Sequence, residues 1–265
     1  MNNLYKKILL LVVVFIVAIF FWFAIKSWVG GVVKFTDPGV WLTPLIALLI
    51  LASVTAISLV LIDDRLYSIL VPFLIGLGFL IVFNFNTLYP GTFSALILFQ
   101  LYGGKLLREE VTERNRINLR VILRRGMPWV ILPLLIMVSF AFYLDPRIQA
   151  AGGTNELPST IKQVISQTVT NFLGRELQSL PSAERQSAEN QITNQVINTF
   201  TDFLKPYFKY TPPVLAFGLF LILQGLSLVF VWLSVWLGMA IFLMLKKINF
   251  VRIIEKTTMA EELKL

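Results

Sequence analysis

Five stretches of this chain contain no Asp, Glu, Lys or Arg: residues 8–25, 41–62, 66–104, 126–144 and 210–245. A helix needs about 20 mainly apolar residues to cross the roughly 30 Å hydrocarbon core of a bilayer, so each stretch can supply at least one crossing. The chain as a whole is 57% hydrophobic and 14% charged, whereas a soluble domain is about a quarter charged. The sequence therefore predicts an all-α fold, a polytopic bundle of transmembrane helices.

The stretch 66–104 is too long for one helix. It contains FNFNTLYPG at residues 83–91, and this cluster of Asn, Pro and Gly is typical of a turn. We therefore expect a hairpin with spans near 66–83 and 87–104, which brings the number of predicted spans to six. The stretch 210–245 would be about 54 Å long as a single helix. It is either one overlong or tilted span or a span followed by an interfacial helix.

The distribution of basic residues predicts the orientation, because short cytoplasmic loops are rich in Lys and Arg. With the N-terminus inside, six spans leave only two lysines, Lys26 and Lys34, in short outside loops. Splitting 210–245 into two spans would instead move the basic C-terminal tail outside. We expect both termini to be cytoplasmic and the protein to lie in the cell membrane (the inner or plasma membrane). The expected inside segments are the start of the chain, 62–66, 105–127 and the tail after 245.

Several chemistries are excluded by composition. The chain contains no Cys and no His, so disulfides, thiolate metal sites, histidine-based zinc sites and serine-hydrolase triads are impossible. No P-loop is present. The first apolar stretch exceeds the 7–15 residues of a signal peptide and no A-x-A site follows it, so an uncleaved anchor is predicted. We expect no enzyme activity, no cofactor and no metal.

Residues 146–211 form a polar island between two apolar stretches and are expected to lie on the extracytoplasmic side. Counting Asp145 just before it, the island has six acidic and six basic residues. Apolar residues recur at steps of three and four in two segments separated by Pro181, which predicts an amphipathic helical hairpin. The two apolar faces either cover each other or form a docking surface over 159–209, for a partner protein or a second copy. The predicted docking residues are Ile161, Val169, Phe172, Ile192, Val196 and Phe200.

The inside segment 105–127 combines apolar residues with many arginines. An amphipathic basic helix of this kind lies at lipid headgroups, where each basic residue contributes about 1 kcal/mol near an anionic surface. Nucleic acid is not an expected partner, since no motif or exposed aromatic set accompanies the charge. The residues predicted to contact lipid headgroups are Arg114, Arg116, Arg120, Arg124, Arg125, Lys246 and Lys247.

Polar residues inside the expected spans are few. Gln100 and Gln224 are expected at comparable depth, and we predict an interhelical hydrogen bond between them, worth about 0.6 kcal/mol. Small residues four apart permit close helix contact, and we expect them to serve internal packing. These pairs are Ala52 with Ala56 and Ser234 with Gly238.

The sequence predicts three regions: the spans of 1–145, the insert 146–211, and the long helix and tail of 212–265. The expected function is that of a non-enzymatic envelope scaffold or assembly factor. The alternative is a small transporter, flippase or channel component with a path lined by Asn84, Asn86, Gln100 and Gln224. A lipid headgroup enzyme using Asp63 and Asp64 is the third possibility.

Overall fold

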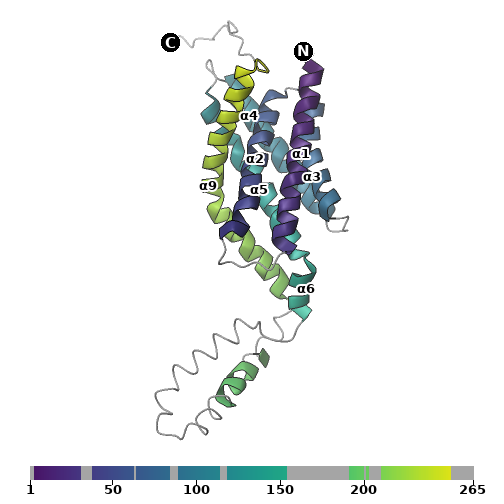
Figure 1. Ribbon diagram of the computed structural model, residues 1–265, viewed down its shortest axis with the longest axis vertical. Coiled ribbons are helices and arrows are strands. Elements are labelled where there is room, and N and C mark those ends of the chain that lie inside the picture. Colours follow the sequence, from purple (N-terminus) through teal and green to yellow (C-terminus); the bar gives the residue numbers. More distant parts are fainter. Residues whose placement is uncertain are drawn as a thin grey trace, which may run out of the picture. The chain divides into compact units, whose positions relative to one another are not determined.

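Within the residues that the computed structural model describes, every element of regular structure is a helix. The described residues are 3–30, 38–62, 64–83, 89–113, 118–153, 191–199, 201–202 and 210–251. The helices are α1 (Asn3–Gly30), α2 (Pro38–Leu61), α3 (Arg65–Phe83), α4 (Tyr89–Glu113), α5 (Leu119–Tyr143), α6 (Pro146–Gly153) and α9 (Thr211–Lys247), shown in Figure 1.

The chain forms two compact units. Met1–Phe142 together with Gly218–Leu265 make one unit, here called the bundle, and Tyr143–Phe217 make the other, here called the insert. Helix α9 belongs to the bundle from Gly218 onward, and the predicted regions 1–145, 146–211 and 212–265 stay a prediction.

Five of the helices are long and apolar enough to cross a membrane: α1, α2, α3, α5 and α9. The prediction of an all-helical fold with several membrane-crossing helices is thus confirmed at this level. Helix α4 is not among the five, because its second half carries charged residues that include Lys105, Glu109 and Glu110. The predicted boundary between two helices here agrees with the structure, since α3 ends at Phe83 and α4 begins at Tyr89, while residues 84–88 lie outside the described residues.

Helices α1 and α3 run parallel and enclose an aromatic core. The fully buried Trp22 donates a hydrogen bond from Nε1 to the carbonyl oxygen of Ile75 at 2.9 Å. Its ring meets the Phe79 ring edge-on, with 4.8 Å between the centroids. Near the end of both helices, Lys26 Nζ donates to the carbonyl oxygen of Val82 at 2.6 Å. The bond to Ile75 satisfies the ring N–H of Trp22, which is the one strong hydrogen-bond donor of that side chain, inside an otherwise apolar contact.

Helix α4 packs antiparallel against α3. Tyr89 at the start of α4 contacts Phe79 near the end of α3, with 4.7 Å between ring centroids. Phe93, one turn later, lies against Gly76, where an added Cβ would overlap the Phe93 ring. At the far end of α4, Gly104 lies opposite Leu59 near the end of α2. A glycine at each crossing lets the helices approach closely.

Helix α5 runs antiparallel to α4 and contacts α9. A Cβ at Gly103 would lie 2.9 Å from Cβ of Trp129, and one at Gly238 of α9 would lie 3.0 Å from Leu123. In α2, Ser53 Oγ donates to the carbonyl oxygen of Ser234 at 2.9 Å. The small residues singled out in the sequence therefore serve packing inside the bundle, as predicted.

Helix α9 is a single helix of 37 residues, so the stretch 210–245 is not split. Its last part packs against α2 and α5 and does not lie flat against the bundle end. It ends in a Schellman motif: the Phe250 N–H donates to Leu245 and the Asn249 N–H to Lys246, with Asn249 in the left-handed region at φ 57°. Asn tolerates that conformation better than most residues.

The motif places Phe250 beside the start of the chain. Lys6 Nζ donates to the Phe250 carbonyl oxygen at 2.6 Å and lies 5.2 Å from the centroid of its ring. The N-terminal end of α1 and the C-terminal end of α9 therefore lie at the same end of the bundle (Figure 1). We call it the charged end, because Lys6, Lys7, Asp64, Glu110 and Arg125 gather there.

The insert is described in part. Asp145 caps α6, since its Oδ1 accepts from the Arg147 N–H at 2.9 Å, a common helix start. Gln149 Nε2 donates to the Tyr143 carbonyl oxygen at 2.6 Å. Residues 191–199 are helical, within the second of the two predicted insert helices. The predicted hairpin as a whole lies largely outside the described residues.

Candidate functional site

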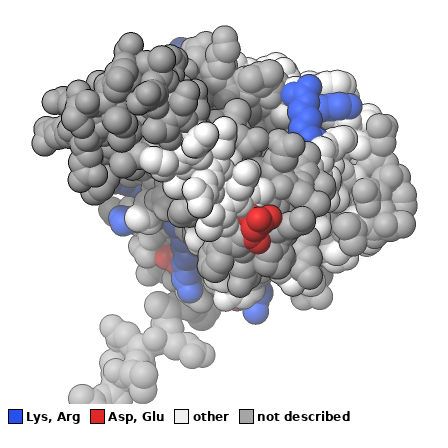
Figure 2. All heavy atoms as spheres, turned by 90° about the horizontal axis from the view of Figure 1, so that it is seen from below, with Lys and Arg blue, Asp and Glu red and all other residues white. Residues whose placement is uncertain are grey.

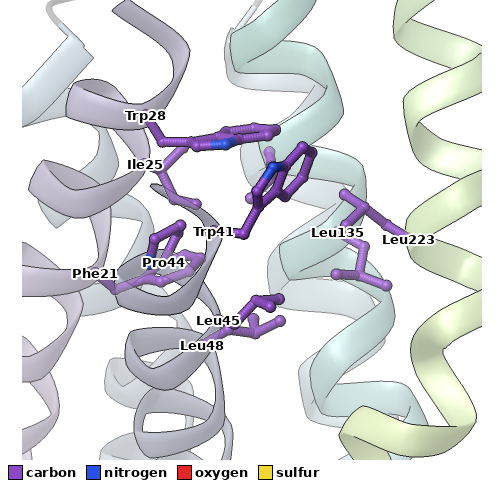
Figure 3. Close-up of a pocket in the computed structure, with 10 residues that line it drawn as sticks. Phe21, Ile25, Trp28, Trp41, Pro44, Leu45, Leu48, Leu135 and Leu223 are labelled. Atoms are coloured by element: carbon purple, nitrogen blue, oxygen red, sulfur yellow. The ribbon is translucent and has the colours of Figure 1, made fainter. Parts of the chain in front are cut away.

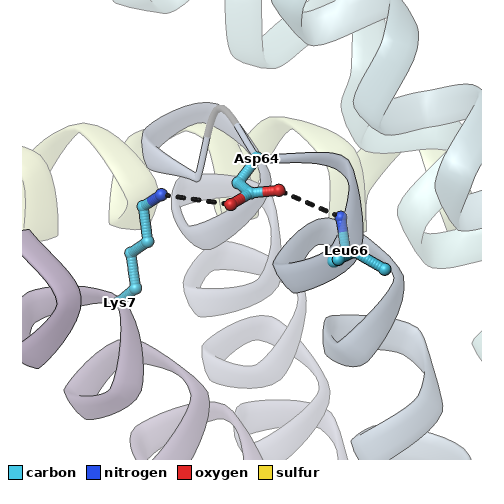
Figure 4. A network of polar contacts seen from close by, with 3 residues as sticks. All are labelled: Lys7, Asp64 and Leu66. Atoms are coloured by element: carbon cyan, nitrogen blue, oxygen red, sulfur yellow. Dashed lines mark hydrogen bonds and ion pairs between the residues drawn. The ribbon is translucent and has the colours of Figure 1, made fainter.

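The charged end carries the first candidate site, around Asp64. Its Oδ2 lies 3.6 Å from Lys7 Nζ and its Oδ1 accepts from the Leu66 N–H at 3.3 Å (Figure 4). Lys7 also lies 5.3 Å from the centroid of the Tyr67 ring. Asp64 thus caps α3 and ties it to α1. Its suggested partner Asp63 lies outside the described residues, and the described part of the chain contains no cluster of three potential metal ligands.

A second polar contact joins α4 and α5 at the same end. Arg125 Nη1 donates to Glu110 Oε2 at 2.6 Å, and the Glu110 side chain is only 7% exposed. The neighbouring Glu109 instead pairs with Lys105 one turn earlier in α4, at 3.6 Å and largely exposed. Local spacing along the helix predicts the Lys105 pair but not the Arg125 pair, because the latter depends on how two helices pack.

The basic segment 105–127 is not one helix. Its first part continues α4 to Glu113 and its last part opens α5 at Leu119. The prediction of a single amphipathic helix there is therefore wrong. The charged residues instead belong to the end of α4 and the start of α5. Of the residues predicted to contact headgroups, Arg120, Arg124, Lys246 and Lys247 are exposed, and Arg125 is half-exposed beside Glu110. Arg114 and Arg116 lie outside the described residues.

A hollow of about 610 Å³ lies between α5 and α9. Arg120 and Arg124 come from the first two turns of α5. The Arg120 guanidinium lies 5.9 Å from the centroid of the Trp236 ring, and the Trp232 and Trp236 rings lie 6.0 Å apart. Sequence reasoning noted the arginines and missed the tryptophans. The four-residue spacing within each pair was the available signal, since it puts each pair on one helix face.

The predicted Gln100–Gln224 hydrogen bond is absent. Gln100 is fully buried, and neither its Oε1 nor its Nε2 has a hydrogen-bond partner among the described residues. Gln224 is exposed on α9. Leu223, the residue before Gln224, is buried and faces the bundle. Successive helix residues project about 100° apart, so Gln224 points to the side of α9 that is exposed. Asn84 and Asn86, the other residues of the suggested path, lie outside the described residues.

A small cavity of about 30 Å³ lies between α1, α2, α5 and α9. As Figure 3 shows, the Trp28 and Trp41 rings lie over it, with Leu45 and Leu135 below. The two rings are 4.8 Å apart between centroids, edge to face. Its lining is apolar, and its volume is about that needed for one water molecule. It is a packing defect at an aromatic layer and not a route for a polar solute.

The predicted docking residues of the insert can be placed only in part. Ile192 and Val196 are half-buried in the helical stretch 191–199, while Gln191 and Gln195 are exposed. This difference agrees with an apolar and a polar helix face. Ile161, Val169, Phe172 and Phe200 lie outside the described residues. In the view of Figure 2 the charged side chains of the described residues form separate spots and no continuous patch of one sign.

Comparison of the chain with models of protein families, with curated proteins and with solved structures finds no match. The class of the protein therefore rests on its own structure. Five helices are long and apolar enough to cross a membrane, and they pack in one unit around a largely apolar core. These features define an all-helical protein of the multi-pass membrane class.

Proposed function

We propose that this chain is a non-enzymatic scaffold or assembly factor of the cell membrane, the inner or plasma membrane. In this proposal six helices span the bilayer and both termini are cytoplasmic. The insert lies on the extracytoplasmic side as a helical hairpin and binds a partner protein or a second copy through 159–209. Lipids contact the exposed basic residues of the charged end.

Helix order supports the sixth span. Lys6 and Phe250 are hydrogen-bonded, so α1 and α9 have their chain ends at one end of the bundle, and an even number of crossings must separate them. Helix α4 contacts α3 at one end, where Tyr89 lies beside Phe79, and α5 at the other, where Glu110 lies beside Arg125. It therefore extends through the bundle as far as these neighbouring helices do. The charged end is rich in basic residues, which favours a cytoplasmic location.

Single cysteines would test this orientation, because the chain has none of its own. We expect Gln191→Cys to react with a membrane-impermeant maleimide in intact cells, and Lys105→Cys and Lys247→Cys to react only after permeabilisation. If α4 did not cross, residues 105 and 191 would exchange sides relative to the N-terminus. Labelling of Lys105→Cys in intact cells would therefore overturn the six-span proposal.

The observation that carries the scaffold proposal is the separate compact unit Tyr143–Phe217 placed in the chain between two helices of the bundle. A two-helix unit buries little apolar surface by itself and often needs a partner. Two of its half-buried side chains, Ile192 and Val196, lie one turn apart on one face. The bundle meanwhile has a core filled by side chains such as Trp22 and Phe79, which suits a rigid anchor.

Deletion of 159–209 tests the role of the insert. We expect the shortened chain to remain in the membrane and to lose a stoichiometric partner that the full chain retains after gentle extraction through a C-terminal tag. The finer test pairs two double variants, Ile192→Ala with Val196→Ala and Gln191→Ala with Gln195→Ala. The first should weaken the complex at least tenfold, because it truncates the apolar face, while the second should leave it unchanged.

The mass of the extracted particle is the readout. Equal effects of the two double variants would show that the apolar face is not the contact. A full-length chain that extracts as a clean monomer would remove the basis for a scaffold.

The alternative, a small transporter, flippase or channel component, has one observation in its favour. Thr55, Ser58 and Ser68 are buried and, like Gln100, have polar side-chain atoms without a hydrogen-bond partner. Gln100 and Thr55 lie one turn before Gly104 and Leu59, which are in contact, so the two residues lie at a similar depth in α4 and α2. Flux through liposomes that contain the purified chain, abolished by Gln100→Leu, would favour this function over a scaffold.

A further inference from the structure

The hollow between α5 and α9 combines a cationic and an apolar wall. Arg120 and Arg124 supply the cationic part, at the charged end of the bundle. The apolar part comes from α9 and includes Leu228, Val229 and Trp232. Its volume of about 610 Å³ falls within the 300–1,000 Å³ typical of small-molecule sites. The two arginines therefore line one hollow together with apolar side chains and are not isolated surface charges.

Within the described residues the two arginines have no carboxylate partner. Neither Arg120 nor Arg124 forms an ion pair within the described part of the chain, whereas Arg125, the next residue, pairs with Glu110. Because they are four residues apart, Arg120 and Arg124 project on one face of α5. Two guanidinium groups on one face form a site for a phosphate, which guanidinium groups bind through paired hydrogen bonds. The charge of the hollow therefore favours an anionic ligand.

The apolar wall extends away from these charges. Trp236 lies next to Arg120, Trp232 follows one turn further from the charged end, and Leu228 another turn beyond. The distance from residue 236 to residue 228 along the helix is about 12 Å. Trp232 is 57% and Leu228 80% exposed, so the wall is open to the surrounding bilayer. Tryptophan prefers the level between headgroups and hydrocarbon, which places the arginines near the phosphates and Leu228 near the acyl chains.

We propose that this hollow binds one anionic phospholipid from the leaflet at the charged end. Arg120 and Arg124 hold its phosphate, and one acyl chain lies along Trp236, Trp232 and Leu228. The amphipathic order of the walls matches the order of groups in a phospholipid, and a free anion would leave the apolar wall unused. The inference rests on the membrane class of the protein and is independent of the scaffold proposal, because lipid binding is measured without any partner.

The test measures lipid binding to the delipidated protein by native mass spectrometry. Phosphatidylglycerol and phosphatidylcholine with identical acyl chains are added in parallel. We expect the first phosphatidylglycerol to bind about tenfold more tightly than phosphatidylcholine, since each basic residue contributes near an anionic headgroup. Arg120→Gln with Arg124→Gln should remove this preference. Lys246→Gln with Lys247→Gln is the comparison, as it removes two exposed cations of the same end outside the hollow and should reduce the preference less than the arginine variant does.

A third variant tests the apolar wall without changing charge. Leu228→Trp places a larger side chain in the hollow, and its high exposure leaves room for the ring, so the variant is expected to fold. It should weaken the first phosphatidylglycerol about threefold or more. The proposal is overturned if the lysine variant removes the preference as fully as the arginine variant, if Leu228→Trp has no effect, or if millimolar inorganic phosphate displaces the lipid completely, which would indicate an anion site alone.

Discussion

Gly103→Leu is expected to destabilise the bundle by about 3 kcal/mol. A Cβ at this position would lie 2.9 Å from Cβ of Trp129 and 3.3 Å from the carbonyl oxygen of Gly126. These atoms belong to or adjoin the backbone of α5, so they cannot move aside as the end of a long side chain would. The two helices must separate, and overpacking of this kind usually costs 1–3 kcal/mol. Unfolding in mixed detergent micelles with increasing SDS measures the effect.

Gly225→Leu is the matched control for this prediction. No atom lies within 4 Å of a Cβ at Gly225, and glycine in a helix is about 0.5–1 kcal/mol less favourable than alanine. The same substitution should therefore leave stability unchanged or raise it slightly. Equal stability of the two variants would contradict the close approach of α4 and α5 at Gly103.

The helices themselves were predictable because of what a bilayer demands. In hydrocarbon each backbone polar group needs a partner within its own segment, so a long charge-free stretch has few options besides a helix. The turn was also readable: Asn, Pro and Gly between Phe83 and Gly91 interrupt the apolar pattern, and α3 and α4 end and begin there. The single long α9 followed from the position of Lys246 and Lys247 after an unbroken apolar stretch.

The rotation of each helix about its axis was not predictable. The residues next to Gln100 and Gln224, over 95–101 and 214–226, are otherwise apolar or glycine, so no amphipathic pattern there indicates which face turns inward. Gln100 is buried and Gln224 exposed. The buried side of α9 includes Leu223 and the small residue Ser234, which permits close approach of the helices, and Gln224 projects about 100° around the helix from Leu223.

The sequence did not indicate the hollow between α5 and α9 or the pair Glu110–Arg125, for a related reason. Both join residues from helices that are not local in sequence, and their partners depend on helix order and rotation together. Spacing of four residues puts Arg120 with Arg124, and Trp232 with Trp236, on one face of each helix separately. It did not indicate that the two faces would meet.

Arg125→Met is expected to cost about 3 kcal/mol of stability, more than the loss of its partner. The Glu110 side chain is 7% exposed and the Arg125 side chain 46%. Without Arg125 the buried carboxylate loses a 2.6 Å charge-assisted bond and regains little hydration. Breaking a buried pair in this way costs about 3–5 kcal/mol, and the exposure of Arg125 puts the expected value at the lower end. Glu110→Gln, by contrast, leaves a guanidinium that water can reach, and should cost about 1 kcal/mol.

The asymmetry makes the prediction testable by a double-mutant cycle in the same SDS titration. Glu110→Gln combined with Arg125→Met should be more stable than Arg125→Met alone, because no buried charge is then left without this partner. Lys105→Met is the control: it removes the cation of the exposed Lys105–Glu109 pair, and exposed pairs of this type contribute about 0–0.5 kcal/mol. If Arg125→Met proved no more harmful than Lys105→Met, the contact between Glu110 and Arg125 would not be what fixes α5 against α4 at the charged end.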